Sequence, residues 1–415
     1  MSPSIRVPTT QDSLAKENQG KSSTALSVTL LASEWDSFKG GLSTINRELA
    51  TELAQHEQVK VTILVPQFSC SEEGKRTAES HNVSIREAER RPGYDDPLDW
   101  LSSPPEDLTI DIIVGHGRKL GKQAQFIRKL HKCKWIQVLH TAPEELGMYK
   151  HYPKAISKGE EKSRIETELC ALADVVAAVG PKLTEAYSSY LRFCKKHQDI
   201  IELTPGVFSE FSDIMQVTNE RDKFKVLIFG RGDPEDFSVK GYDIAAKAIV
   251  ELKDSSYHLV FVGTPDGKQE EVAENLLQSG ISRNQLFVRR FIQRREGLKE
   301  LFCEVDLVIM PSRTEGFGLT ALEALSAGLP ILVSGNSGFG DTLRNLPLGK
   351  PFVVDSADPK DWAKAIRTVR RKDRTERLQD IQRLRTSYEG KFSWEKQCEA
   401  VVEKMWSLVH GRTLT

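Results

Sequence analysis

The sequence predicts an α/β protein of two doubly wound domains, each a parallel sheet with helices on both faces. Short apolar runs with strand propensity alternate with segments of helical periodicity, the order expected of a parallel sheet. This alternation runs through two successive series of similar length, separated by a stretch of weaker periodicity. The 415 residues suffice for two or three domains of about 150 residues each.

The first series follows a polar N-terminal segment. Residues 1–24 are rich in Ser, Thr, Gln and Lys, and this composition predicts a disordered tail. Residues 25–208 form the first predicted domain, with a helix expected at 43–56. Its expected strands are 26–33, 59–66, 111–115, 134–140, 174–180 and 199–206.

Residues 209–223 have the weaker periodicity and are predicted to link the domains. The second domain is expected at 224–390, and a final helix at 391–411. Within that helix, apolar residues recur with a spacing near 3.6 at Val401, Val402, Met405, Trp406 and Val409. The second domain has expected strands at 225–230, 258–263, 285–291, 306–312 and 330–335, and expected helices at 242–253, 269–280 and a segment ending near Tyr388.

The composition excludes several classes of protein. Lys and Arg number 58 against 59 Asp and Glu, and this balance argues against a dedicated nucleic-acid binder. The sequence has no apolar run of 18 residues, so no membrane span is expected. Its six cysteines are irregularly spaced without a C-x-x-C pair, which predicts free thiols and a cytoplasmic location.

Common nucleotide-binding and hydrolase motifs are absent from the sequence. Gly230-Arg231-Gly232 follows an expected strand, but Glu235 occupies the third glycine position of a dinucleotide-binding loop. The sequence contains no acceptable phosphate loop, no G-x-S-x-G elbow and no H-E-x-x-H metal helix. Dinucleotide, serine-hydrolase and zinc-protease chemistry are therefore not predicted.

The strongest pattern runs from Ser312 to Pro330, directly after an expected strand. Gly316 and Gly318 allow the backbone to approach a ligand, and the helix that follows favours an anion at its N-terminus. One carboxylate, Glu315, precedes this helix, and a second, Glu323, lies about two turns further on. A sugar on Glu315, a ribose on Glu323 and a diphosphate between them would fit a nucleotide-sugar. The alternative is a solvated loop glutamate and an ordinary helix glutamate.

The run E-G-F-G-L-x-x-x-E-A-x-x-x-G-x-P closely resembles the E-x7-E signature of retaining glycosyltransferases of the GT-B fold, chiefly family 4. The resemblance extends over about residues 26–410 and implies two Rossmann-like domains that face a central cleft. It implies that the C-terminal helix returns to the first domain. It also places the nucleotide-sugar donor on these residues: Glu315, Gly316, Phe317, Gly318, Leu319, Thr320 and Glu323.

Three further segments carry the resemblance. Lys39-Gly40-Gly41-Leu42 is similar to the family's glycine-rich first loop, which approaches the diphosphate. Thr204-Pro205-Gly206-Val207 is similar to the P-x-G-V segment before the interdomain linker. Gly230-Arg231 with Lys240-Gly241 resembles the pair whose cations bind the donor phosphates. The eight residues between Arg231 and Lys240 exceed the usual family spacing.

Two histidines follow strands of the first domain, at His116 and His140. Family members commonly place an active-site histidine after one of these strands, so His140 is expected to be catalytic and His116 to be a possible additional site residue. The alternative is a structural histidine bonded to loop backbone.

The resemblance implies retaining transfer of a hexosyl unit from a nucleotide-sugar to a hydroxyl acceptor, which stays unidentified. UDP-glucose and UDP-N-acetylglucosamine are the expected donors, because they are common in the family. The expected catalytic residues are Glu315, His140, Arg231 and Lys240. No cofactor besides the donor is expected, and no metal, because no D-x-D site appears where the diphosphate would lie. The alternatives are a silent nucleotide-sugar-binding or scaffold module and a nucleotide-sugar epimerase.

Overall fold

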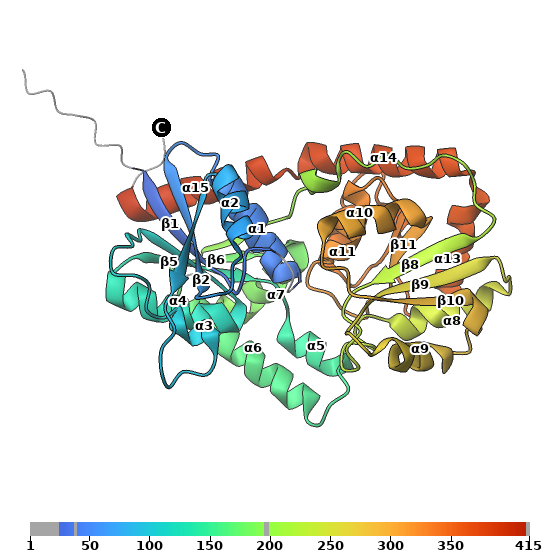
Figure 1. Ribbon diagram of the computed structural model, residues 1–415, viewed down its shortest axis with the longest axis horizontal. Helices are drawn as coiled ribbons and strands as arrows, with labels where there is room; N and C mark the ends of the chain where they lie inside the picture. Colours follow the sequence, from blue (N-terminus) through green and yellow to red (C-terminus); the bar gives the residue numbers. More distant parts are fainter. Residues whose placement is uncertain (1–24, 37–39, 195–198, 412–415) are drawn as a thin grey trace, which may run out of the picture.

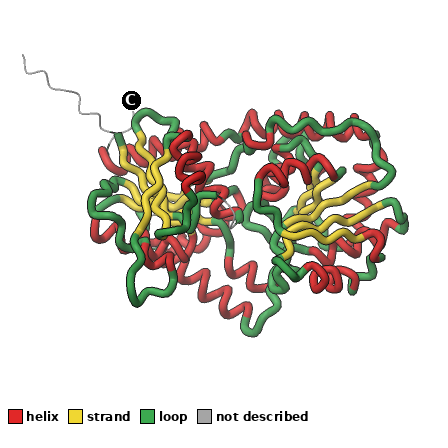
Figure 2. Tube along the Cα trace, in the orientation of Figure 1, coloured by secondary structure: helices red, strands yellow, loops and turns green. Residues whose placement is uncertain are grey.

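The computed structural model describes residues 25–36, 40–194 and 199–411; Lys39 and the tail predicted at 1–24 lie outside them. Two lobes lie side by side, each built on one sheet (Figure 1). Helices flank the strands of each sheet, as Figure 2 shows. The strand pairs of both sheets are parallel. The predicted fold of two doubly wound α/β units is therefore confirmed.

The first sheet has seven strands in the order β3-β2-β1-β4-β5-β6-β7. Its central strands are buried, which explains why they read as nearly continuous apolar runs in the sequence. The strands are β1 (Leu26–Leu31), β2 (Val59–Pro66), β3 (Val83–Ala88), β4 (Ile112–His116), β5 (Lys134–Leu139), β6 (Val175–Ala178) and β7 (Asp199–Glu202).

The second sheet has six strands in the order β10-β9-β8-β11-β12-β13. Counted from its own first strand, this is the same 3-2-1-4-5-6 order as in the first sheet, the order of the Rossmann fold. The strands are β8 (Phe224–Phe229), β9 (Tyr257–Thr264), β10 (Leu286–Arg290), β11 (Leu307–Met310), β12 (Ile331–Ser334) and β13 (Val353–Val354).

Helices connect successive strands, as parallel pairing requires. Those of the first lobe are α1 (Gly41–Leu53), α2 (Glu72–Ser80), α3 (Pro97–Trp100), α4 (Gly117–His131), α5 (Pro143–Tyr149), α6 (Ala155–Leu172) and α7 (Pro181–Tyr190). Those that follow are α8 (Tyr242–Leu252), α9 (Gln269–Leu277), α10 (Arg295–Glu304), α11 (Leu319–Ser326), α12 (Gly338–Arg344), α13 (Pro359–Arg371), α14 (Arg374–Lys391) and α15 (Trp394–His410).

Two strands escaped the sequence analysis. Strand β3 lies at the edge of the first sheet, and its run VSIREA is half-exposed and rich in charge. Strand β13 has two residues, too few to show any periodicity. Edge position and shortness therefore remove the apolar signal by which the other strands were recognised.

The segment expected to link the lobes at 209–223 packs closely against the protein. It contains the short 3₁₀ helix η2 (Ser209–Phe211), in which the Phe211 side chain is fully buried. The Gln216 amide donates hydrogen bonds to the carbonyls of Phe302 and Ala327 in the second lobe. The linker is thus held by buried contacts that its weak periodicity does not reveal.

The chain crosses back at its end. Helix α14 runs along the second lobe, and α15 lies on the first lobe (Figure 1), where it packs against α1. The side chain of Gln397 accepts a hydrogen bond of 2.9 Å from the backbone N–H of Thr204. A Cβ on Gly206 would lie 2.6 Å from the backbone nitrogen of Trp394, so the two crossing segments touch where only a glycine fits.

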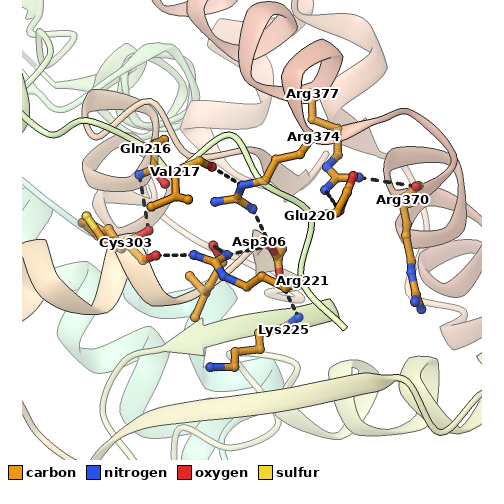
Figure 3. Close-up of polar contacts among 12 residues, drawn as sticks. Gln216, Val217, Glu220, Arg221, Lys225, Cys303, Asp306, Arg370, Arg374 and Arg377 are labelled. Carbon is orange, nitrogen blue, oxygen red and sulfur yellow. Dashed lines mark hydrogen bonds and ion pairs between the residues drawn. The ribbon is translucent and has the colours of Figure 1, made fainter. Parts of the chain in front are cut away.

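A buried ionic cluster closes the amino edge of the second sheet, opposite the edge where ligands bind in such sheets. Asp306, directly before β11, accepts hydrogen bonds from the guanidinium groups of Arg221 and Arg374 and from the backbone N–H of Lys225 (Figure 3). Arg221 belongs to the linker, and Arg374 begins α14. One carboxylate therefore ties both segments that pass between the lobes to the second sheet.

Candidate active site

The loops at the two topological switch points face each other between the lobes. In each sheet the strand order reverses between its first and fourth strands, the usual position of a ligand. These points lie after β1 and β4 in the first lobe, and after β8 and β11 in the second. A cleft of about 1010 Å³ is lined by residues of both lobes, among them Ser43, Lys119, Arg231 and Phe291.

The loop after β11 reaches across to the first lobe. Gly318, with φ near 113°, caps the N-terminus of α11, a conformation that favours glycine. A Cβ on Gly316 would lie 2.2 Å from the carbonyl oxygen of His140, so only a glycine allows this contact. Leu319 and Thr320, the first residues of α11, are half-buried. The glycines of the E-x7-E segment thus set the loop against the strand end that carries His140.

Glu315 lies in this loop beside a cation. The Lys240 ammonium donates a hydrogen bond of 2.5 Å to Oε2 of Glu315. The backbone N–H of Glu315 donates to the carbonyl of Asn336, which fixes the loop to the segment after β12. The carboxylate predicted to contact the sugar and the lysine predicted to contact phosphate are therefore direct neighbours.

The long segment between Arg231 and Lys240 folds into turns. The backbone N–H of Arg313 donates to the Val239 carbonyl, and its guanidinium forms two hydrogen bonds of 2.8 Å with Asp243 at the start of α8. Asp236 lies 3.2 Å from Lys150 of the first lobe. The inserted residues are thus fixed on both sides, and Lys240 at their end still reaches Glu315.

Arg231 lies where the two glycine-rich loops meet. Its carbonyl accepts a hydrogen bond from the Tyr242 hydroxyl, which also fills the space next to Gly230. A Cβ on Gly40 would lie 3.2 Å from Nη2 of Arg231, and one on Gly41 would lie 2.9 Å from the Leu319 side chain. The first loop, the arginine and the N-terminus of α11 thus converge on one spot. Their N–H groups and positive charge suit a diphosphate.

The two predicted histidines form a pair. Nδ1 of His116 and Nε2 of His140 are 2.9 Å apart, so one ring donates a hydrogen bond to the other. Burial lowers the pKa of His140 to about 4 and that of His116 well below its usual value. Both rings are therefore neutral near pH 7. His116 is fully buried, whereas His140 is partly exposed.

Glu323 lies in a buried ionic contact that the sequence did not predict. Nη1 of Arg295 donates a hydrogen bond of 2.9 Å to Oε1 of Glu323. Burial raises the pKa of Glu323, and the charge of Arg295 acts against that rise. Arg295 is the first residue of α10 and follows a mostly exposed segment, and no motif distinguishes it from its basic neighbours.

A second group missed by the sequence supports the loop from the first lobe. Lys182 on α7 donates hydrogen bonds of 2.8 Å to Thr314 and to the side chain of Asn336. Glu145 on α5 lies 2.8 Å from the same ammonium. These contacts hold the residue next to Glu315 between the lobes.

Phe317 is predicted to bind the donor, but its side chain packs in the interior of the protein. The ring is buried against Phe339, and a Cβ on Gly180 would lie 2.5 Å from it. Only the backbone of Phe317 is left to face a ligand. Among residues 25–36, 40–194 and 199–411, no group of three or more His, Cys, Asp or Glu side chains could hold a metal ion.

Comparison with known proteins gives one family. Residues 29–401 match the family described as "Family 4 Glycosyltransferase in conflict systems". The D-inositol 3-phosphate glycosyltransferase of Corynebacterium urealyticum is 27% identical over 327 residues, 72% of this chain and 72% of the relative. That of Corynebacterium jeikeium is 28% identical over 327 residues, 71% of this chain and 72% of the relative.

Two solved structures share the fold. Sucrose-phosphate synthase from Thermosynechococcus elongatus superposes with a TM-score of 0.71 at 18% identity, covering 93% of this chain and 100% of the other. Anabaena Alr3699/HepE in complex with UDP-glucose gives a TM-score of 0.64 at 15% identity, covering 92% and 100%. Across the described part of this chain, no helix combines the length and apolarity needed to traverse a bilayer.

Proposed function

This chain belongs to the family 4 glycosyltransferases of conflict systems, and from that premise we propose a retaining hexosyltransferase that uses a UDP-sugar without a metal ion. The transferase activity and the GT-B fold follow from the family. One observation carries the finer proposal: the Lys240–Glu315 pair, Arg231 and the Gly40–Gly41 loop converge between the two switch points. This arrangement can bind a sugar and its diphosphate together.

We assign each part of the donor to a group on the second lobe. The Arg231 guanidinium, Lys240 and the N-terminus of α11 stabilise the charge that grows on the departing diphosphate. Glu315 accepts hydrogen bonds from the sugar hydroxyls, and Glu323 accepts them from the ribose. Because two protein cations supply the positive charge, no metal ion is required in this scheme. The UDP-glucose complex of Anabaena Alr3699/HepE supports the choice of donor.

The acceptor binds on the first lobe in this proposal. The first lobe contributes Phe68, Asp96, Trp100 and Lys119 to the lining of the cleft. Attack from the face on which the diphosphate departs would retain the anomeric configuration, with a donor phosphate oxygen taking the acceptor proton. His140, neutral near pH 7, can donate or accept one hydrogen bond at the reacting sugar.

The cellular location is part of the same proposal. The cysteines of the chain are all unpaired in the structure, at positions 70, 133, 170, 194, 303 and 398. Free thiols persist in reducing compartments, so we propose that the protein acts in the cytoplasm.

The test is a screen of UDP-glucose and UDP-N-acetylglucosamine by thermal shift, followed by turnover. A donor that binds only the folded protein raises its melting temperature. The enzyme should then slowly hydrolyse the donor to UDP and free sugar. NMR should show that the sugar is released as the α-anomer. Binding without turnover would favour a silent nucleotide-sugar module, and a changed sugar stereocentre would favour an epimerase.

Two variants assign the carboxylates. Glu323→Ala should weaken UDP binding about 10- to 150-fold, because the ribose loses a charged hydrogen-bond acceptor. Glu315→Ala should spare UDP binding and lower turnover. Glu270→Ala, which removes an exposed glutamate of α9, is the matched control and should change neither. If all three variants behave alike, the donor site is misplaced.

A further inference from the structure

A chain of alternating charges joins the two lobes beside the proposed ribose site. It begins at Glu48 and Arg47 on α1, passes through Glu210 in η2 and Arg295 on α10, and ends at Glu323 on α11. Successive partners are 2.9–3.3 Å apart. Their side chains are between 11% and 23% exposed, so solvent screens these charges little.

Arg295 is the branching point of this chain. While Nη1 contacts Glu323, Nη2 lies 3.3 Å from Glu210 and 3.4 Å from the Thr44 hydroxyl on α1. Its guanidinium also lies 5.6 Å from the centre of the Phe211 ring. One side chain of the second lobe therefore touches the donor carboxylate, the linker and the first lobe at once.

The charges of the group do not cancel. Three carboxylates face two guanidinium groups, and burial raises the pKa of both Glu48 and Glu323. The groups that face Glu323 are Arg295 from α10, Glu210 from η2 and Arg47 from α1. Of these three groups, Arg295 bonds directly to Glu323, so it opposes the protonation of that carboxylate most strongly.

We propose that Arg295 is a positioning residue that holds Glu323 for the donor ribose, and that Glu210 couples donor affinity to the contact between the lobes. The inference rests on the proposed role of Glu323. It predicts that side chains that never touch the donor, Glu210 above all, contribute to donor binding. Because Arg295 acts through Glu323, its loss raises KM for the donor more than it lowers kcat.

The first test measures UDP-glucose binding by calorimetry. Arg295→Gln should weaken binding about 10- to 100-fold, and Arg295→Lys less, because a lysine keeps the charge and loses the second contact. Arg289→Gln is the matched control, since Arg289, like Arg295, pairs with a glutamate, here Glu304, but lies on the surface. Melting temperatures identify any variant that fails to fold, and Arg295→Lys then carries the test.

The pH dependence separates positioning from a merely structural role. The diphosphate diester of UDP-glucose does not titrate between pH 6 and 8, so changes there report on the protein. In Arg295→Gln, the loss of affinity toward low pH should begin at a higher pH than in the wild type, because Glu323 keeps the burial that raises its pKa and loses the charge that opposes the rise. Arg295→Lys keeps that charge and should follow the wild type, and adding Glu323→Gln to Arg295→Gln should abolish the added pH dependence. Superposable pH profiles for Arg295→Gln and the wild type overturn the positioning role.

The coupling has its own test. Glu210→Gln should weaken UDP-glucose binding about 5-fold or more, within the usual range of coupling between sites. Glu220→Gln is its control, because Glu220 lies in the same linker and pairs with Arg377 away from the cleft. If both linker variants bind like the wild type, the coupling is wrong.

The outcomes for the two proposals differ. No binding of UDP-glucose by the wild type, or normal binding by Glu323→Ala, removes the proposed donor site and the inference with it. Weak binding by Glu323→Ala together with normal binding by Arg295→Gln overturns the inference alone.

Discussion

Glu166 on α6 is a buried carboxyl whose replacement should remove a pH-dependent cost of folding. The side chain lies beside Gly117, the residue that follows His116. A Cβ on Gly117 would lie 3.2 Å from its Oε1, and the Tyr187 hydroxyl donates a hydrogen bond of 2.9 Å to its Oε2. Burial raises the pKa of Glu166 to about 7, although the Tyr187 hydrogen bond and the charge of Arg118 act against the rise.

The magnitude follows from the two pKa values. The ordinary value is 4.5 and the folded value about 7, and each tenfold difference in proton affinity is worth about 1.4 kcal/mol. Below pH 4.5 both folded and unfolded chains hold the proton. Between pH 4.5 and 7 the unfolded chain releases it first, so the free energy of unfolding falls by about 3 kcal/mol as the pH rises. Above pH 7 the loss is complete.

Glu166→Gln should therefore gain stability relative to the wild type as the pH rises. Urea unfolding at pH 5, 6, 7 and 8 gives the difference between the two proteins, in which their other titrating groups cancel. Glu168→Gln is the matched control, because Glu168 lies on the same helix in an exposed pair with Arg164. A difference that stays constant over this range, or that falls with pH, refutes the reasoning.

Four further predictions concern the site and the C-terminal helix. EDTA should leave turnover within about twofold, far from the loss expected when a catalytic metal is removed. Arg231→Lys should lower kcat about 10- to 1000-fold with a smaller change in donor KM, because an ammonium cannot reproduce two parallel hydrogen bonds to phosphate. Lys240→Ala should have a similar effect, since its ammonium lies against Glu315. Truncation after Phe392 should lower the melting temperature, because it removes six buried side chains of α15, whereas deletion of residues 1–24 should not.

Each of these has a clear contrary result. Activity that is abolished by EDTA and restored by manganese or magnesium would contradict the metal-free scheme. Full kcat in Arg231→Lys would remove the phosphate-binding role of that residue. An unchanged kcat in Lys240→Ala together with a strongly reduced kcat in Arg231→Lys would show that the inserted turns hold the lysine away from the diphosphate. Equal melting temperatures for the two truncations would count against the role of α15.

Much of the architecture could be predicted from residue patterns. Central parallel strands are buried on both faces and therefore read as short apolar runs, which located most strands of both sheets. The glycines at 316 and 318 and the carboxylates at 315 and 323 singled out the loop after β11 as the predicted donor site, because a close backbone approach restricts the residue types locally. Edge strand β3 was missed for the opposite reason, since half-exposed residues obey no such restriction.

The contacts within the site depended on the tertiary structure. The sequence suggested that His116 and His140 each follow a strand, but only the packing of β4 beside β5 joins the rings and fully buries that of His116. Arg295 is an ordinary basic residue at the start of α10, and its contact with Thr44 spans 251 positions of the chain. Lys182 and Thr314 are 132 positions apart.

The physical reason is that local constraints restrict which residue types occur at a position, whereas contacts between distant residues do not. Burial and backbone conformation act on each residue where it stands, so they select apolar runs and glycines that can be read in order. An ion pair between separate elements requires only that the fold bring two charges to one place. That depends on where whole sheets and helices pack, so for Arg295 and Glu323 only the folded chain decides which arginine meets which glutamate.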